Sequence, residues 1–301
     1  MKKIDQPANN LRIAIFISSH GFGHAARATA IAEALSKRIP NLQFDLLTAV
    51  PEWFFKSAHI QFDYHYLDCD PGLKQTNPFD VDLQGSAYVL DRLLPFDQIQ
   101  IKTIAKRLNE RRCRLVLCDV AVFGIAVAKI ARLPSVLVEN FTWDWIYHAL
   151  SPRLPILGHY ADILAPLIPQ ADLHIQTQPV CSPDSRALTV PPVSREPRTE
   201  RRTTREQLGI DAKKHLIFIT LGGVAHDHPY LQHLIDQPGP YYFLVAGAES
   251  ANRIAHNVHI LPARSTYFHP DLVHSADLVI GKAGYSTLSE VFHAGTRFAY
   301  F

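Results

Sequence analysis

The chain has 301 residues, of which 47% are hydrophobic and 19% are charged, a balance typical of a globular protein with room for about two domains. The net charge of +2 and the scattered basic residues argue against a nucleic-acid-binding surface. The polar start of the chain does not form a signal peptide, and the apolar run at residues 13–17 is far shorter than a membrane span of roughly 20 residues, so we expect a cytoplasmic protein.

The first half of the chain alternates strand-like and helix-like patterns. Its predicted strands lie at residues 11–17, 44–47, 115–118 and 135–138, and its predicted helices lie at residues 24–38, 99–111 and 123–131. Strands that alternate with helices form parallel sheets with right-handed crossovers. We therefore predict an α/β fold with a Rossmann-like first domain over residues 1–190.

A polar stretch separates this half from the next one. Residues 194–205 contain five arginines and little that could enter a core. An interdomain linker is therefore predicted at residues 191–205. A charge run of this kind is typical of a solvated connector, although arginines beside a cleft can also bind phosphate.

The second half repeats the alternation, which predicts a second Rossmann-like domain over residues 206–301. Strands are predicted at residues 216–221, 242–246, 258–261 and 278–280, and a helix at residues 287–294. A last strand pattern begins at residue 297 and runs to the end of the chain, so we expect a truncated second domain with an exposed edge strand at which oligomers can form. The four cysteines have no CxxC spacing and are expected to be reduced thiols.

The strongest chemical signal is the segment at residues 277–290. A strand leads into Gly281 and Gly284, which permit a tight turn, and Ser286 or Thr287 is placed to cap the next helix. Free amide groups at such a helix start can bind a diphosphate. Lys282 adds a cation beside them, so this turn is a candidate phosphate site.

Glu290 lies about one turn into that helix and has two interpretations. Its carboxylate can accept hydrogen bonds from two ribose hydroxyls, or it can serve a helix cap or the helix dipole. The spacing of Gly281, Gly284, Thr287 and Glu290 resembles the nucleotide-sugar signature of GT-B glycosyltransferases, including plant glucosyltransferases and the transferase that forms lipid II. That resemblance favours the ribose interpretation.

The first half resembles a narrower group. Residues 19–27, 70–82 and 140–147 are similar to the glycosyltransferase-like domain that precedes the kinase in plant arabinokinases, and to its stand-alone bacterial relatives. The resemblance covers nearly all of the chain, and its motifs keep their order. It implies two Rossmann-like domains with parallel sheets, the GT-B fold, in which the first domain binds the acceptor and the second binds the sugar donor.

The resemblance also implies a catalytic base on the first glycine turn. In related transferases a Gly-His pair carries that base, and the pair falls on Gly23 and His24 here, with His20 as a rival on the same turn. Histidine suits the role because its ordinary pKa of about 6.5 lets it take a proton near neutral pH. Alternatively, one histidine orients the turn and the other contacts the substrate. Further acceptor-side candidates are Gly21, Asn140, Trp143 and Asp144. The aromatic ring of Trp143 either forms a platform for a sugar or packs between the domains.

Other carry-overs from the family fall in the second half. Gly222 and Gly223 resemble its second glycine turn, which faces the diphosphate, and Ala263 and Arg264 correspond to the segment near the nucleobase. Residues 226–228 with His233 form a candidate metal cluster, but such histidines in a loop are more often solvated polar sequence. The resemblance implies no metal and no cofactor.

The sequence therefore predicts an inverting, metal-independent glycosyltransferase that moves a sugar from a nucleoside diphosphate, with UDP as the expected carrier, to a sugar, lipid or small-molecule hydroxyl. Two alternatives are a non-catalytic nucleotide-sugar-binding or interaction module and a nucleotide-sugar epimerase on the same architecture. The apolar residues 154–157 and 163–168 are candidates for docking a lipid-linked acceptor at a membrane surface, a partner protein or the other domain.

Overall fold

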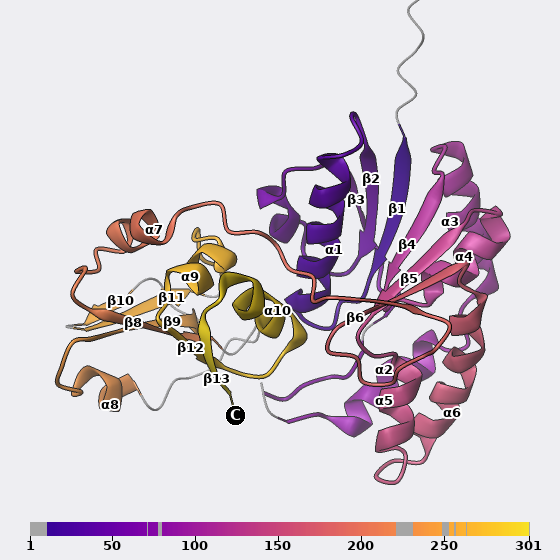
Figure 1. Cartoon of the computed structure of the whole chain (residues 1–301). Coiled ribbons are helices and arrows are strands. Elements are labelled where there is room, and N and C mark those ends of the chain that lie inside the picture. Colours follow the sequence, from indigo (N-terminus) through magenta and orange to yellow (C-terminus); the bar gives the residue numbers. More distant parts are fainter. Residues whose placement is uncertain are drawn as a thin grey trace, which may run out of the picture. The chain divides into compact units, whose positions relative to one another are not determined.

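The computed structural model describes residues 11–300, except 71, 78–79, 221–230, 249–252, 256 and 263. The chain forms two compact units, which are described separately here (Figure 1). The first unit contains most of residues 11–191. The second contains residues 192–300 together with two short segments, Gly21–Arg27 and Gln75–Asp82.

The first unit is built on a parallel sheet that has seven strands within the described residues. These strands are β1 (Arg12–Ile17), β2 (Gln43–Thr48), β3 (Gln61–Tyr66), β4 (Leu115–Asp119), β5 (Ser135–Glu139), β6 (Leu173–Thr177) and β7 (Leu188–Val190). Their order is β3-β2-β1-β4-β5-β6-β7, so the direction of winding changes between β1 and β4. Ligands of such folds bind beyond the carboxyl ends of the strands at that point.

Helices cover both faces of this sheet, with α1 on one face and α3 and α4 on the other (Figure 1). The helices are α1 (Phe22–Ser36), η1 (Glu52–Ser57), α2 (Leu83–Leu93), α3 (Gln98–Glu110), α4 (Phe123–Ala131), α5 (Trp143–Leu150), α6 (Ile156–Leu164) and η2 (Ala165–Gln170). Because both faces are covered, residues Ile13 to Ile17 of β1 are all at most 3% exposed. This explains why the sequence of β1 is a continuous apolar run.

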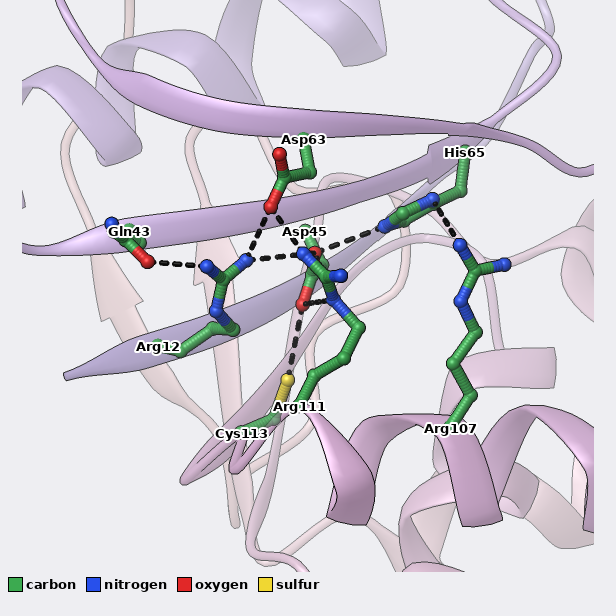
Figure 2. Close-up of polar contacts among 8 residues, drawn as sticks. All are labelled: Arg12, Gln43, Asp45, Asp63, His65, Arg107, Arg111 and Cys113. Atoms are coloured by element: carbon green, nitrogen blue, oxygen red, sulfur yellow. Dashed lines mark hydrogen bonds and ion pairs between the residues drawn. The ribbon is translucent and has the colours of Figure 1, made fainter. Parts of the chain in front are cut away.

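A charge cluster around the buried Asp45 joins residues of β1, β2 and β3 (Figure 2). The side chain of Asp45 is 0% exposed, and its Oδ1 lies 3.0 Å from Arg12 Nη1 and 2.9 Å from His65 Nε2. Arg111, just after α3, donates to both oxygens of Asp45 and also contacts Asp63. The cluster therefore joins three strands to the end of α3.

The second unit is built on a sheet that has six strands within the described residues, in the order β10-β11-β9-β8-β12-β13. They are β8 (His215–Thr220), β9 (Tyr241–Ala248), β10 (Arg253–Ala255), β11 (Val258–Pro262), β12 (Leu278–Gly281) and β13 (Arg297–Tyr300). All pair in parallel except β10, which is antiparallel to β11. The helices are α7 (Arg201–Gln207), α8 (Leu231–Ile235), α9 (His269–Ser275) and α10 (Tyr285–Ala294).

Alternate residues of β8 enter two separate cores in this unit. Leu216 and Phe218 pack with residues of α9 and α10 on one face, whereas Ile219 packs with β9 and β11 residues on the other. A strand covered on both faces has no polar side, which explains the apolar run at this strand too.

The α/β fold with two parallel sheets is confirmed, and most predicted elements begin and end within two residues of the observed ones. Residues 194–205 differ from the solvated connector that we expected, because they belong to the second unit and their last five residues form the start of α7. None of the four cysteines, all of which lie among the described residues, forms a disulfide. No helix in the described part of the chain combines the length and apolarity that crossing a membrane requires.

Candidate functional site

The glycine turn predicted to bind phosphate connects β12 to α10. A side chain at Gly281 is excluded, because its Cβ would lie 2.2 Å from the carbonyl oxygen of Thr220. Gly284 is the N-cap of α10 and offers no side-chain hydrogen bond. The helix starts at Tyr285, so Ser286 and Thr287 belong to its first turn and are not the caps that we expected. Glycine is among the residues that helices accept at the N-cap.

The first turn of α10 has amide groups directed out of the helix. The first backbone bond into the helix runs from Leu288 N to Gly284 O, at 2.9 Å. No acceptor among the residues that the structure describes pairs with the amide hydrogens of Ser286 or Thr287. Both residues are only partly buried. The helix start therefore keeps two amide donors of the kind that bind anions.

Glu290 is buried at 3% exposure and is held by two side chains of its own unit. Its Oε1 lies 3.2 Å from Arg195 Nη2, and its Oε2 lies 2.6 Å from His269 Nδ1. Burial raises the pKa of this carboxyl, but the charges and hydrogen bonds of His269 and Arg195 outweigh burial, so the pKa is lower than usual. The carboxylate is therefore ionised, and neither of its oxygens lacks a partner.

Sequence reasoning missed His269 and assigned Arg195 to a linker. The His269 ring lies between Glu290 and the end of β8, with its Nε2 3.3 Å from Thr220 Oγ1. The guanidinium of Arg195 lies over the Phe268 ring, 4.9 Å from its centre. Pro270, in the first turn of α9, is a local signal for this helix start, but the contact between His269 and Glu290 joins residues 21 positions apart and has no local signal.

Three of the predicted nucleotide-site residues, Gly222, Gly223 and Ala263, lie outside the described residues, as does the 226–228 histidine cluster. Arg264 and Lys282 are described and exposed. Their roles remain predictions.

The turn after β1 and the start of α1 carry the candidate bases. Gly21 has a φ of +73°, which glycine adopts readily, and α1 begins at Phe22. Gly23 and His24 therefore lie in the first turn of α1 rather than before it. His24 is 8% exposed, whereas His20 is partly exposed.

Two of the acceptor-side candidates, Asn140 and Trp143, are more buried than a contact surface would be. Asn140 is 3% exposed, and its Nδ2 donates to Thr177 O at 2.5 Å. Trp143 is 4% exposed, so it packs inside this unit instead of presenting a sugar platform. Asp144 lies in the first turn of α5, where its Oδ1 is buried without a hydrogen bond among the described residues.

Trp143 packs against the turn that carries His20. The two rings meet edge to face, with centres 5.0 Å apart. The indole Nε1 donates to Asp70 Oδ2 at 2.9 Å. Burial raises the pKa of Asp70 to about 7, although the Trp143 hydrogen bond opposes this shift. Asp70 was part of a sequence motif, but its contact with Trp143 was not predicted.

Comparisons with known proteins agree with this architecture. No protein-family model matches the chain. The chain is 26% identical over 309 residues to L-arabinokinase of Arabidopsis thaliana, and this match covers 99% of the chain but only 29% of the kinase.

Solved structures show the same fold at low identity. A UDP-glucosyltransferase from Polygonum tinctorium superposes with a TM-score of 0.64 at 12% identity, over 97% of this chain and 80% of that one. Phytolacca americana UGT2, solved with UDP-2-fluoro-glucose and pterostilbene, gives a TM-score of 0.61 at 12% identity, over 97% and 80% of the two chains. With its two Rossmann-like sheets and these neighbours, the chain has the GT-B glycosyltransferase fold.

Proposed function

We propose that the chain is a metal-independent, inverting glycosyltransferase that moves a sugar from a nucleoside diphosphate, with UDP as the carrier, to a hydroxyl acceptor. The observation that carries this proposal is the start of α10. There, the Ser286 and Thr287 amides have no acceptor within the described residues, and the ionised carboxylate of Glu290 lies one turn further along the helix.

The diphosphate is proposed to bind the first turn of α10 and the ribose to bind Glu290. Each hydrogen bond from an amide to a charged phosphate oxygen contributes roughly 1.5–3 kcal/mol, more than the helix dipole at roughly 0.3–1 kcal/mol. The side chain of Glu290 is itself only 2% exposed, so the ribose contact requires His269, whose side chain is 33% exposed, to move away from Oε2. The side chain of Arg195, which holds Oε1, is only 9% exposed.

The chemistry is a single displacement. The acceptor hydroxyl gives its proton to a histidine of the turn after β1, its oxygen bonds to the anomeric carbon, and the nucleoside diphosphate leaves from the opposite side. The amide groups of α10 stabilise the negative charge that grows on the leaving phosphate. The solved UDP-glucosyltransferase neighbours support this choice of carrier.

Calorimetry with UDP tests the nucleotide site. Glu290→Gln is expected to weaken UDP binding about 10- to 100-fold, because it removes the charge from one ribose hydrogen bond worth roughly 1.5–3 kcal/mol. Glu206→Gln is the matched control, since Glu206 is an exposed residue of α7 in the same unit. Equal UDP affinity in wild type and Glu290→Gln would remove the ribose assignment.

Turnover tests the base. Of the variants His20→Ala and His24→Ala, one is expected to lower the rate of sugar transfer by roughly 10²–10⁴ while leaving UDP affinity unchanged. Full activity in both variants would show that neither histidine is the base.

A second candidate is a nucleotide-sugar-binding module without turnover. Two observations favour it: both oxygens of Glu290 already have side-chain partners, and the chain corresponds to 29% of a sugar kinase. Such a module would bind UDP-sugars with measurable affinity but would neither transfer the sugar nor hydrolyse the donor over hours of incubation.

A further inference from the structure

The loop after the edge strand β3 brings Asp70 to the end of β1. In the sheet order β2 lies between these two strands, so the loop crosses it. Both the backbone nitrogen and the hydroxyl of Ser19 donate to Asp70 O, at 3.1 Å each. The turn that carries His20 is therefore bound to the backbone of Asp70.

The side chain of Asp70 reaches the same turn by a second route, through Trp143. The indole nitrogen can only donate a hydrogen bond, and it donates to Asp70 Oδ2 at 2.9 Å. The indole ring also meets the His20 ring edge to face, with ring centres 5.0 Å apart. Trp143 also stacks on Tyr147, with ring centres 5.6 Å apart. The indole is thus fixed on its polar edge and on one face, and the His20 ring packs against it.

Gly72 closes this arrangement from the side of the loop. A Cβ at Gly72 would lie 2.5 Å from Trp143 Cζ2 and 2.7 Å from His20 Cβ, so only glycine fits. The carbonyl of Gly72 accepts from Tyr147 OH at 3.2 Å. The backbone of the loop therefore packs directly on the Trp143 ring and on the Cβ of His20.

Burying a carboxyl group at residue 70 is energetically unfavourable if its only role is to accept a hydrogen bond from Trp143. Asp70 is 8% exposed, and a backbone carbonyl would accept from the indole without the desolvation of a charge. Burial raises its pKa to about 7, so the group changes charge near neutral pH. Buried carboxyls with this behaviour gather at functional sites.

We propose that Asp70 positions the His20 ring through the Trp143 indole, and that His20 is the base of the transfer reaction. This inference rests on the proposed function and deepens it. Asp70 touches neither substrate nor reacting atoms, so it is a positioning residue.

The reaction that His20 is proposed to catalyse is a nucleophilic substitution coupled to a proton transfer. The acceptor hydroxyl gives its proton to the His20 imidazole as its oxygen bonds to the anomeric carbon. The bond from that carbon to the diphosphate oxygen breaks, and its electron pair leaves on the diphosphate. Because a displacement of about 1 Å in a reacting group can cost on the order of 10²-fold in rate, the contact with Trp143 is catalytically relevant.

Nuclear magnetic resonance of the full-length chain tests the contact without any substrate. The chain has three tryptophans, and Trp143→Phe identifies the indole signal of Trp143. That signal is expected to shift with a midpoint near pH 7 in the wild type and to stay constant in Asp70→Asn. The control Asp68→Asn removes a neighbouring exposed carboxylate and is expected to keep the titration at a somewhat lower pH.

The His20 ring-proton signals, identified with His20→Gln, report the position of the ring. The indole ring current displaces them in the wild type, and Asp70→Ala is expected to return them toward ordinary values. Asp68→Asn is expected to leave them in place.

Hydrolysis of UDP-glucose, with water as the acceptor, tests the catalytic consequence. Asp70→Ala is expected to lower kcat about 10- to 100-fold with an unchanged KM for UDP-glucose. Asp70→Asn is expected to recover part of the loss, since its amide oxygen can accept from the indole. Asp68→Asn is expected to match the wild type. A purely structural role would reduce the folded fraction but leave kcat per folded molecule unchanged.

Wild-type kcat in Asp70→Ala would overturn the proposal, whether or not the His20 signals move. A constant Trp143 indole signal between pH 5.5 and 8.5 would also overturn it. If the wild-type chain neither binds UDP nor hydrolyses UDP-glucose, the proposed function fails and His20 is no base. The His20 signals then still decide whether Asp70 holds the ring.

Discussion

Replacing Asp45 with asparagine is expected to destabilise the first unit by about 3 kcal/mol. The Asp45 carboxylate is fully buried and accepts from Arg12, His65 and Arg111 (Figure 2). Arg107 Nη2 lies 2.9 Å from the other ring nitrogen of His65. Because arginine only donates, His65 accepts there and must donate to Asp45 from Nε2. Asparagine can replace few of these contacts, because its NH₂ group would face donors.

The magnitude follows from what the variant leaves behind. Removing one partner of a buried ion pair costs roughly 3–5 kcal/mol, because the remaining charge stays desolvated. Arg12 and Arg111 keep contacts with Asp63, whose side chain is 49% exposed, so the lower end of that range applies. At about 2–4 °C per kcal/mol for a unit of this size, Tm should fall by about 6–12 °C.

Urea unfolding followed by circular dichroism measures the effect, with Asp63→Asn as the control. The exposed Asp63 is expected to contribute less than about 1 kcal/mol. Burial raises the pKa of Asp45, but hydrogen bonds from His65 and Arg111 and the Arg12 charge outweigh burial and lower it well below its usual value. The stabilisation is therefore present above the ordinary carboxyl pKa and is lost as the pH falls below it. Stability of Asp45→Asn within about 1 kcal/mol of the wild type at pH 7 would refute this reasoning.

Three further changes give separate tests. Gly72→Ala should destabilise more than Gly209→Ala in thermal unfolding, because both have positive φ but only Gly72 meets Trp143; equal losses would contradict the packing. The pKa of Asp70 is raised from 3.8 to about 7 in the folded chain. The free energy of unfolding of the wild type, relative to Asp70→Asn, should therefore fall by up to about 4 kcal/mol as the pH rises from about 4 to about 7. A difference between the two proteins that does not change with pH would contradict burial of the group. Asp277→Ala should cost about 1–3 kcal/mol in denaturant unfolding, because its carboxylate joins α7 to β8, and a neutral effect would show that this connection is weak.

The β12 turn shows what local sequence can establish. A strand was predicted at residues 278–280 and a helix at residues 287–294, and the structure has Leu278–Gly281 and Tyr285–Ala294. Both elements depend on nearest neighbours: an apolar run, two glycines and a helix-forming segment. The helix start was placed two residues too late because side-chain capping was assumed, whereas Gly284 caps through its backbone.

Strand β3 shows where the same reasoning fails. Its sequence alternates the polar residues Asp63 and His65 with aromatic residues, and no strand was predicted there. These polar residues are accommodated because the strand lies at the edge of the sheet and meets Arg12 and Arg111. That compensation requires residues that lie 51 and 48 positions away, which no local pattern reveals.

The arginines at residues 194–205, near the candidate site, likewise depend on partners that are distant in the sequence. A charge run is solvated unless acidic groups elsewhere in the fold can pair with it, and here Arg195 pairs with Glu290 and Arg205 with Asp277, 95 and 72 residues later. Those partners are assembled only when β12 and α10 pack beside β8. His269 and, to a smaller extent, Arg195 hold the Glu290 pKa low, so a residue predicted to belong to the linker contributes to the charge of the carboxylate proposed to bind the nucleotide. The connector and the proposed nucleotide site are therefore parts of one packed structure, and changes at Arg195 should be interpreted through Glu290.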